Sequence, residues 1–139
     1  LAGGVAAAIA GAYAWKRCDA RADSATRYGL FEAVLAHTPR SDVRRGIERA
    51  ADLDFDLSIE TVVSYVGTGR NISCQDTVPF CVWVAAKHLD DYQTAIVQTI
   101  RGGGDIDTNC AIVGGIVVLA VGREGIPRGW LRDREELVV

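Results

Sequence analysis

Apolar residues recur along most of the chain at the three- and four-residue spacing of an amphipathic α-helix. In residues 42–53, for example, Ile47, Ala50 and Leu53 form an apolar stripe opposite a row of arginines. Short polar turns separate these segments, and residues 67–71 are expected to form one because they contain two glycines. The periodicity predicts helices over residues 1–17, 28–36, 42–53, 58–66, 76–88 and 90–101.

Residues that favour helix N-termini precede several of these segments. Ser41 and Ser58 are predicted N-caps, because a serine hydroxyl can accept a hydrogen bond from a free N–H group of the first turn. Asp76 or Thr77 is expected to cap the next helix. Pro79 would then lie in the first turn of that helix, where proline is tolerated.

Residues 111–121 are ambiguous, because they are apolar throughout and rich in β-branched side chains. Such a segment suits a buried strand as well as a buried helix. Its length is at the upper limit for a strand, and Asp107 and Thr108 offer a helix cap just upstream. These two features favour the helix, but the pattern alone leaves both structures open.

The composition is that of an ordinary soluble globular protein, with 49% apolar and 24% charged residues. The net charge of -3 provides no general attraction for nucleic acid or anionic lipid, so neither is an expected partner. The apolar start of the chain falls short of the roughly 18 apolar residues that a transmembrane helix needs. It also lacks the charged region that precedes the core of a signal peptide.

The four cysteines, at positions 18, 74, 81 and 110, form no C-x-x-C pair and no compact cluster with histidine. We interpret them as reduced thiols of a cytoplasmic protein. The sequence contains no methionine, although a natural chain begins with one. We therefore expect a processed chain or a fragment of a longer polypeptide.

Candidate chemistry is concentrated in the loop of residues 102–109, which begins with three glycines. Asp105 and Asp107 follow at alternate positions, and Thr108 is adjacent. In an extended segment, residues two apart project to the same side. Two carboxylates and a hydroxyl could therefore converge on one hard cation, such as Mg²⁺, Mn²⁺ or Ca²⁺.

The same loop has a purely structural interpretation. Glycine permits a tight turn and aspartate caps helices, so the motif could be only a turn followed by an N-cap. Two protein carboxylates are also too few for a closed metal site. Spacing and residue type leave both interpretations open.

Longer motifs connect this loop to a known family. Gly-Gly-Asp-x-Asp-Thr, followed by Ala-Ile-Val-Gly-Gly-Ile, resembles the C-terminal signature of the ADP-ribosylglycohydrolases, which include the dinitrogenase reductase-activating glycohydrolases. Residues 75–80, Gln-Asp-Thr-Val-Pro-Phe, resemble a family segment about 30 residues upstream of that loop. Residues 124–127, Glu-Gly-Ile-Pro, also lie in the expected place, and the resemblance extends from Glu32 to the end of the chain.

The resemblance implies an all-α fold, an orthogonal multi-helix bundle, in which residues 1–139 are the C-terminal part of a single domain and residues 111–121 are helical. It implies a two-metal centre, usually Mg²⁺ with Mn²⁺ possible. Asp105 and Asp107 would be metal ligands and catalytic carboxylates, with Asp107 bridging both ions, and Thr108 would add its hydroxyl. The family reaction removes ADP-ribose from a modified protein side chain or a small acceptor.

One departure from the family pattern limits these expectations. The N-terminal half of the family domain contributes a Thr-Asp-Asp ligand cluster and an upstream glutamate, and this sequence contains no such cluster. We therefore expect half of a site, inactive alone, which pairs with the missing N-terminal half or associates with itself. The competing hypothesis is a non-catalytic remnant of the fold with a structural or interaction role.

Overall fold

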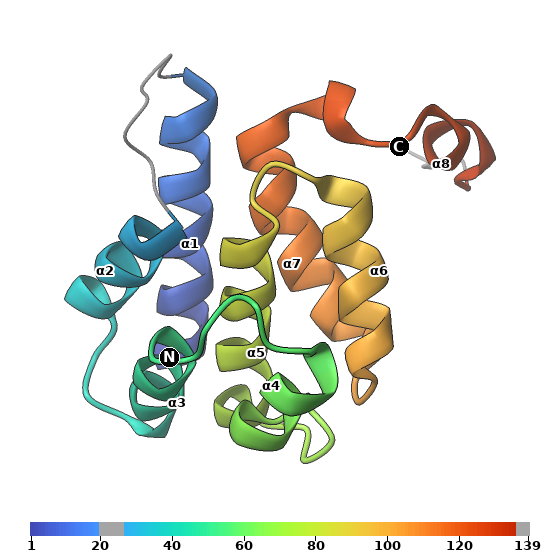
Figure 1. Ribbon diagram of the computed structural model, residues 1–139. Coiled ribbons are helices and arrows are strands. Elements are labelled where there is room, and N and C mark those ends of the chain that lie inside the picture. The colour runs from blue at the N-terminus through green and yellow to red at the C-terminus, as the bar shows by residue number, and fades with distance from the viewer. Residues whose placement is uncertain (20–26, 136–139) are drawn as a thin grey trace.

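The computed structural model describes residues 1–19 and 27–135, which form α-helices, one short 3₁₀ helix and no β-strand (Figure 1). The predicted all-α fold class is confirmed. The elements in chain order are α1 (Ala2–Asp19), α2 (Arg27–His37), α3 (Asp42–Ala51), α4 (Ile59–Val66), α5 (Cys74–Lys87), α6 (Tyr92–Gly102), α7 (Ile106–Val121), η1 (Arg123–Gly125) and α8 (Arg128–Asp133).

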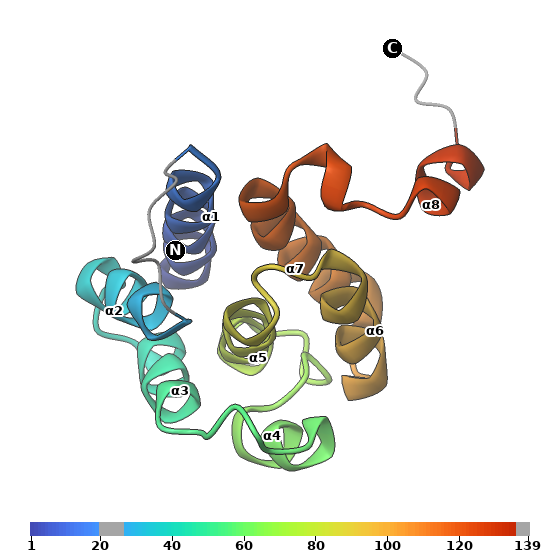
Figure 2. The ribbon, with the colours of Figure 1, turned by 45° about the horizontal axis from the view of Figure 1, so that its top comes forward.

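Helix α5 lies at the centre of the bundle, and Figure 2 shows helices α1 to α4, α6 and α7 around it. Every residue from 77 to 86 is buried, so most of this helix has no solvent-facing side. Trp83 and Phe80 are its largest side chains, and both are fully buried. A helix that is apolar on all sides requires such a central position.

Two of the predicted caps are confirmed. The Ser41 hydroxyl accepts a hydrogen bond from the Arg44 N–H at 3.2 Å, and the Ser58 hydroxyl accepts one from the Thr61 N–H at 3.3 Å. Helix α6 begins after Asp91, slightly later than predicted, and the Asp91 carboxylate accepts from the Thr94 N–H at 2.9 Å. These caps depend on residues three positions apart, which explains why the local pattern predicts them.

The predicted start of α5 is wrong. Its N-cap residue is Ser73 and its first residue is Cys74, so Pro79 is an interior residue rather than a first-turn residue. The reason is a bond between Asp76 and the turn just before the helix. The Asp76 carboxylate accepts a hydrogen bond from the Asn71 N–H at 2.8 Å, and so holds the preceding turn instead of capping the helix.

The interior proline of α5 lies where α3 approaches most closely. Pro79 has no N–H to donate to the Gln75 carbonyl, which leaves that oxygen without its usual helical partner. Gly46 of α3 faces this position: a Cβ on Gly46 would lie 2.5 Å from Pro79 Cγ and 3.5 Å from the Gln75 oxygen. The absence of a side chain at Gly46 therefore permits the close packing of α3 on α5.

We expect Gly46→Ala to destabilise the fold by about 1–3 kcal/mol, because the added methyl group overpacks the contact with Pro79. The matched control is Gly115→Ala in α7, where a Cβ would meet nothing within 4 Å. That control is expected to raise the free energy of unfolding by about 0.5–1 kcal/mol through helix propensity. Urea unfolding of the two variants measures both changes, and equal stability would contradict the packing argument.

Residues 111–121 are helical and lie within α7, so the helix favoured by the sequence is confirmed. Val113, Ile116 and Val117 form its buried side, and α7 packs against α1, α5 and α6. Because the neighbours are helices that leave no free strand edge, a helix is the arrangement that satisfies its backbone groups. Among residues 1–19 and 27–135, no helix combines the length and the apolar character needed to cross a membrane.

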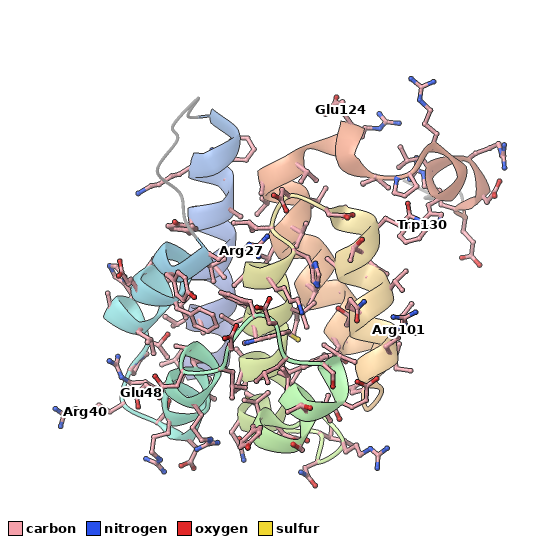
Figure 3. All side chains as sticks on the ribbon, in the orientation of Figure 1. Arg27, Arg40, Glu48, Arg101, Glu124 and Trp130 are labelled. Carbon is pink, nitrogen blue, oxygen red and sulfur yellow. The ribbon has the colours of Figure 1, made fainter. Side chains whose placement is uncertain are left out.

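The arginines of α3 are largely neutralised within the helix. Arg44 pairs with Glu48 at 2.9 Å and donates to the Thr38 carbonyl at 2.8 Å, and Arg45 pairs with Asp42. Figure 3 shows Arg40 extending from the preceding loop into solvent. This surface is therefore a solvated face with its own counter-charges.

Candidate metal centre

The N-terminal ends of α1, α5 and α7 lie at the same end of the bundle, the lower end in Figure 1. Residues from all three ends line one open pocket of about 440 Å³. Because a helix N-terminus carries a partial positive charge, the three parallel ends favour negative charge at this end of the molecule.

The glycine-rich loop turns the chain from α6 into α7. Helix α6 ends at Gly102, and Gly103 and Gly104 have φ angles of +69° and +73°, a region that favours glycine. Asp105 then occupies the N-cap position, and α7 begins at Ile106. The loop therefore presents its acidic residues at the first turn of a buried helix.

The prediction that the acidic residues lie in an extended segment is wrong, because α7 already includes Asp107 and Thr108. Their predicted capping role is also wrong, since the N-cap residue is Asp105. The side chains converge for a different reason. Asp105 and Thr108 are three residues apart and share one face of the first turn, and both line the 440 Å³ pocket.

The Asp105 carboxylate makes no capping hydrogen bond, although Asp105 occupies the N-cap position. The caps of α3, α4 and α6 do make such bonds through Ser41, Ser58 and Asp91. Ser73, the N-cap residue of α5, makes no side-chain capping bond either. The Asp105 carboxylate is not used to cap the helix and remains available to a ligand.

Asp107 lies close enough to Asp105 for their carboxyl groups to interact. Hydrogen bonding to the Asp105 side chain, and then to the backbone N–H groups of Thr108 and Asp107, lowers the pKa of the Asp107 carboxyl. The Asp107 side chain is exposed at the start of α7. Asp107 thus lies beside Asp105 at the first turn of α7.

The turn of residues 67–72 packs directly against this loop. The Thr68 carbonyl accepts hydrogen bonds from the Asp105 N–H at 3.1 Å and from Asn109 Nδ2 at 2.8 Å. A Cβ on Gly69 would lie only 3.0 Å from the Asp105 Cβ. The sequence predicts this segment only as a turn and does not indicate its contact with Asp105. The two glycines that flank Thr68 were the available signal for a close approach.

Two open pockets meet at Asp105. The first, already described, is mainly apolar apart from Asp105 and the hydroxyl groups of Ser73, Thr77 and Thr108. The second measures about 430 Å³ and is lined by Gly69, Arg70, Ile72, Gly104 and Asp105. Ile72 borders both pockets and has a φ of +50°, which is unusual for a β-branched residue. Strained backbone of this kind often occurs beside ligand sites.

The donor set suits Mg²⁺ or Mn²⁺, because both ions prefer carboxylate and hydroxyl oxygens. Within residues 1–19 and 27–135, no group of three or more His, Cys, Asp or Glu side chains could hold an ion. The residues at the start of α7 therefore fit part of a coordination sphere. Further ligands would have to be water, substrate or polypeptide outside these residues.

The chain matches the family model for ADP-ribosylglycohydrolase over residues 1–138. It belongs to the ADP-ribosylglycohydrolase family. Over 113 residues the chain is 28% identical to a protein of Acanthamoeba polyphaga mimivirus that carries the name of an ADP-ribosyl glycohydrolase. The match covers 79% of this chain and 33% of that relative, so the chain spans about a third of the relative's length. No solved structure matches the chain significantly.

Membership of the ADP-ribosylglycohydrolases gives the acidic loop a chemical context, because the family consists of metal-dependent hydrolases. The family match includes the turn of residues 67–72, the start of α5 and the start of α7. In this ADP-ribosylglycohydrolase chain, the tertiary structure brings these three segments to one end of the bundle.

Proposed function

We propose that this chain supplies part of a divalent-metal centre that hydrolyses the glycosidic bond of an ADP-ribosylated protein or small molecule. Asp105, Asp107 and Thr108 are the proposed protein ligands, and Asp105 and Asp107 are the proposed catalytic carboxylates. The proposed ions are two Mg²⁺, for which Mn²⁺ can substitute.

One observation carries the proposal: the N-cap carboxylate of α7 is not used for capping and lies beside a second carboxylate, in a chain of a metal-dependent hydrolase family. Asp91, the N-cap residue of α6, accepts a hydrogen bond from the first turn of its helix, whereas Asp105 accepts none. The pocket beside it provides further support. Three helix N-termini favour a negatively charged ligand there, and ADP-ribose carries a diphosphate.

The proposed reaction adds water across the bond between the anomeric carbon of ribose and the acceptor. The hydroxyl of water joins the carbon, and its proton goes to the departing acceptor. Negative charge on Asp105 and Asp107 would stabilise the positive, oxocarbenium-like transition state, as carboxylates do in other glycosidic cleavages. When bound, the metal ions would help to orient the ribose hydroxyls and to activate the water.

Completion of the site requires more ligands than the described residues offer, and the chain spans about a third of its mimivirus relative. We propose that the remaining ligands come from the rest of the family domain, so that this chain alone is inactive. Exposed apolar residues such as Ile72, which is 88% exposed, would be covered either by the rest of the domain or by self-association of this chain.

We also propose a cytoplasmic location. Cys74, Cys81 and Cys110 are free thiols, which agrees with it.

The test uses the intact gene product that contains this chain and a panel of arginine-linked, serine-linked and small-molecule ADP-ribose conjugates. We expect release of ADP-ribose from at least one conjugate in the presence of Mg²⁺. Removal of divalent ions by EDTA should abolish release, and added Mg²⁺ or Mn²⁺ should restore it, because the ions stabilise charge in the transition state.

Calorimetry on the same protein distinguishes the enzyme from the alternative, a non-catalytic structural or interaction module. The enzyme hypothesis requires saturable binding of Mg²⁺ or Mn²⁺. An intact protein that binds neither ion and releases no ADP-ribose would overturn the proposed function and support the structural role.

A further inference from the structure

Asn109 is a fully buried polar residue in the first turns of α7. Its Nδ2 donates to the Thr68 carbonyl at 2.8 Å and, more weakly, to the Gly103 carbonyl at 3.4 Å. Its Oδ1 lies 3.5 Å from Cys81 Sγ and can accept from the thiol. The side chain therefore joins the turn of residues 67–72, the glycine-rich loop and α5.

The Thr68 carbonyl is the point at which this network reaches the candidate metal centre. It accepts from Asn109 Nδ2 and also from the Asp105 N–H, at 3.1 Å. The Asn109 N–H in turn donates to the Asp105 carbonyl at 2.9 Å. The backbone of Asp105 is thus held on both sides. Its carbonyl is held by an ordinary main-chain bond of the helix, and its N–H is held by the Thr68 carbonyl, to which the Asn109 side chain also donates.

We propose that Asn109 is a positioning residue that holds the Asp105 backbone in place for metal binding and thereby sets the affinity for the ion. This inference rests on the proposed function. A loop that is already ordered before the ion binds loses no further conformational entropy on binding. If only a fraction of the molecules have the loop in the metal-binding conformation, the apparent affinity falls by that fraction. Buried residues that orient metal ligands commonly change metal affinity by about 10- to 100-fold when substituted.

The residue type explains the choice of test. Leucine has the same number and branching of side-chain heavy atoms as asparagine and a larger volume, but no hydrogen-bonding group, so Asn109→Leu removes both Nδ2 bonds and leaves no cavity. In the intact gene product we expect Asn109→Leu to bind Mn²⁺ about 10- to 100-fold more weakly than the wild type, measured by calorimetry and by the Mn²⁺ electron paramagnetic resonance signal.

Two variants serve as matched controls. Thr99 of α6 is fully buried and donates its hydroxyl to the Ala95 carbonyl at 2.8 Å, so Thr99→Val removes a buried hydrogen bond outside the candidate site. Cys81→Ala removes the thiol beside Asn109 Oδ1 but keeps both Nδ2 bonds. Both controls are expected to lower stability and to leave Mn²⁺ affinity unchanged.

A second measurement needs no metal. In the metal-free intact protein, hydrogen exchange is followed by mass spectrometry. Peptides covering residues 103–109 should exchange faster in Asn109→Leu, because the Thr68 carbonyl, which accepts from the Asp105 N–H, is no longer held by Asn109 Nδ2. Peptides from α4 should keep the exchange rate of the wild type. Thr99→Val should leave residues 103–109 unchanged.

The outcomes distinguish failure of the positioning role of Asn109 from failure of the proposed metal-dependent function. If the wild type binds Mn²⁺ and Asn109→Leu binds it equally well, or loses no more affinity than Thr99→Val, the positioning role is overturned. If the wild type binds no Mn²⁺, the proposed function fails, and the exchange rate of residues 103–109 still decides whether Asn109 orders the loop. If Asn109→Leu does not fold, Asn109→Ser takes its place, and wild-type affinity in that variant would overturn the inference.

Discussion

Asp107→Asn is expected to weaken Mg²⁺ and Mn²⁺ binding by the intact protein by more than about 100-fold. Substitution of residues that only orient metal ligands lowers metal affinity by roughly 10- to 100-fold, and loss of a direct ligand should lower it further. The substitution keeps the shape of the side chain and removes its charge. Asp107 is the carboxylate proposed to bridge both ions, so release of ADP-ribose should be lost as well. Calorimetry and an ADP-ribose release assay measure the two effects.

The matched control for Asp107→Asn is Glu60→Gln. Glu60 is also an exposed acidic residue in the first turn of a helix, and backbone and side-chain hydrogen bonds lower the pKa of its carboxyl too. Both substitutions remove a charge that interacts favourably with the helix dipole. Only Asp107→Asn should change metal binding. Equal metal affinity in the two variants would exclude Asp107 as a ligand.

Gly104→Ala is expected to lower the free energy of unfolding by about 2–5 kcal/mol, combining backbone strain with overpacking. Gly104 has a φ of +73°, which disfavours alanine. A Cβ there would also overlap the Thr68 carbonyl oxygen and lie 2.6 Å from the Thr68 Cβ. To accept the methyl group, the turn must move away from Asp105 and break the 3.1 Å bond from its N–H.

Gly103→Ala provides the control for backbone strain. Gly103 has a similar φ, +69°, but a Cβ there would meet nothing within 4 Å. Its expected cost is therefore only the strain, about 1–2 kcal/mol. The difference between the two variants in urea unfolding measures the contact with Thr68. Gly104→Ala should also lose more Mn²⁺ affinity than Gly103→Ala, and equal losses of stability and affinity would contradict the proposed docking of the turn.

Local sequence signals predict α1 to α6 and several of their ends correctly, but they do not predict η1 or α8. The Ser41 and Ser58 caps connect atoms three residues apart, so the residues that decide them are adjacent in the sequence. The helix over residues 111–121 was compatible with two structures until the family resemblance favoured one, because a fully apolar run has no distinctive period. The all-α fold was therefore predictable from helical periodicity and motif together.

The predicted start of α5 is wrong because Asp76 binds the turn just before the helix instead of capping the helix. Asp76 is a good capping residue in isolation, but in the folded chain its carboxylate binds the Asn71 N–H. Pro79 likewise lies inside the helix, where the glycine of α3 packs against it. Helix-capping propensity indicates which hydrogen bonds a side chain can make, but in the folded protein several N–H groups compete for the same carboxylate.

At the candidate site, the residue types alone show which oxygen donors are available and that glycines precede them. Only the structure shows that Asp105 occupies the N-cap position of α7 without making a capping bond. It also decided that Asn109 and Thr68, 41 residues apart, fix the loop between them. Hydrogen bonds over such distances depend on the packing of α5 and α7, and no local pattern encodes them. The chemistry was thus visible in the residue types, and its geometry arose from the packed helices.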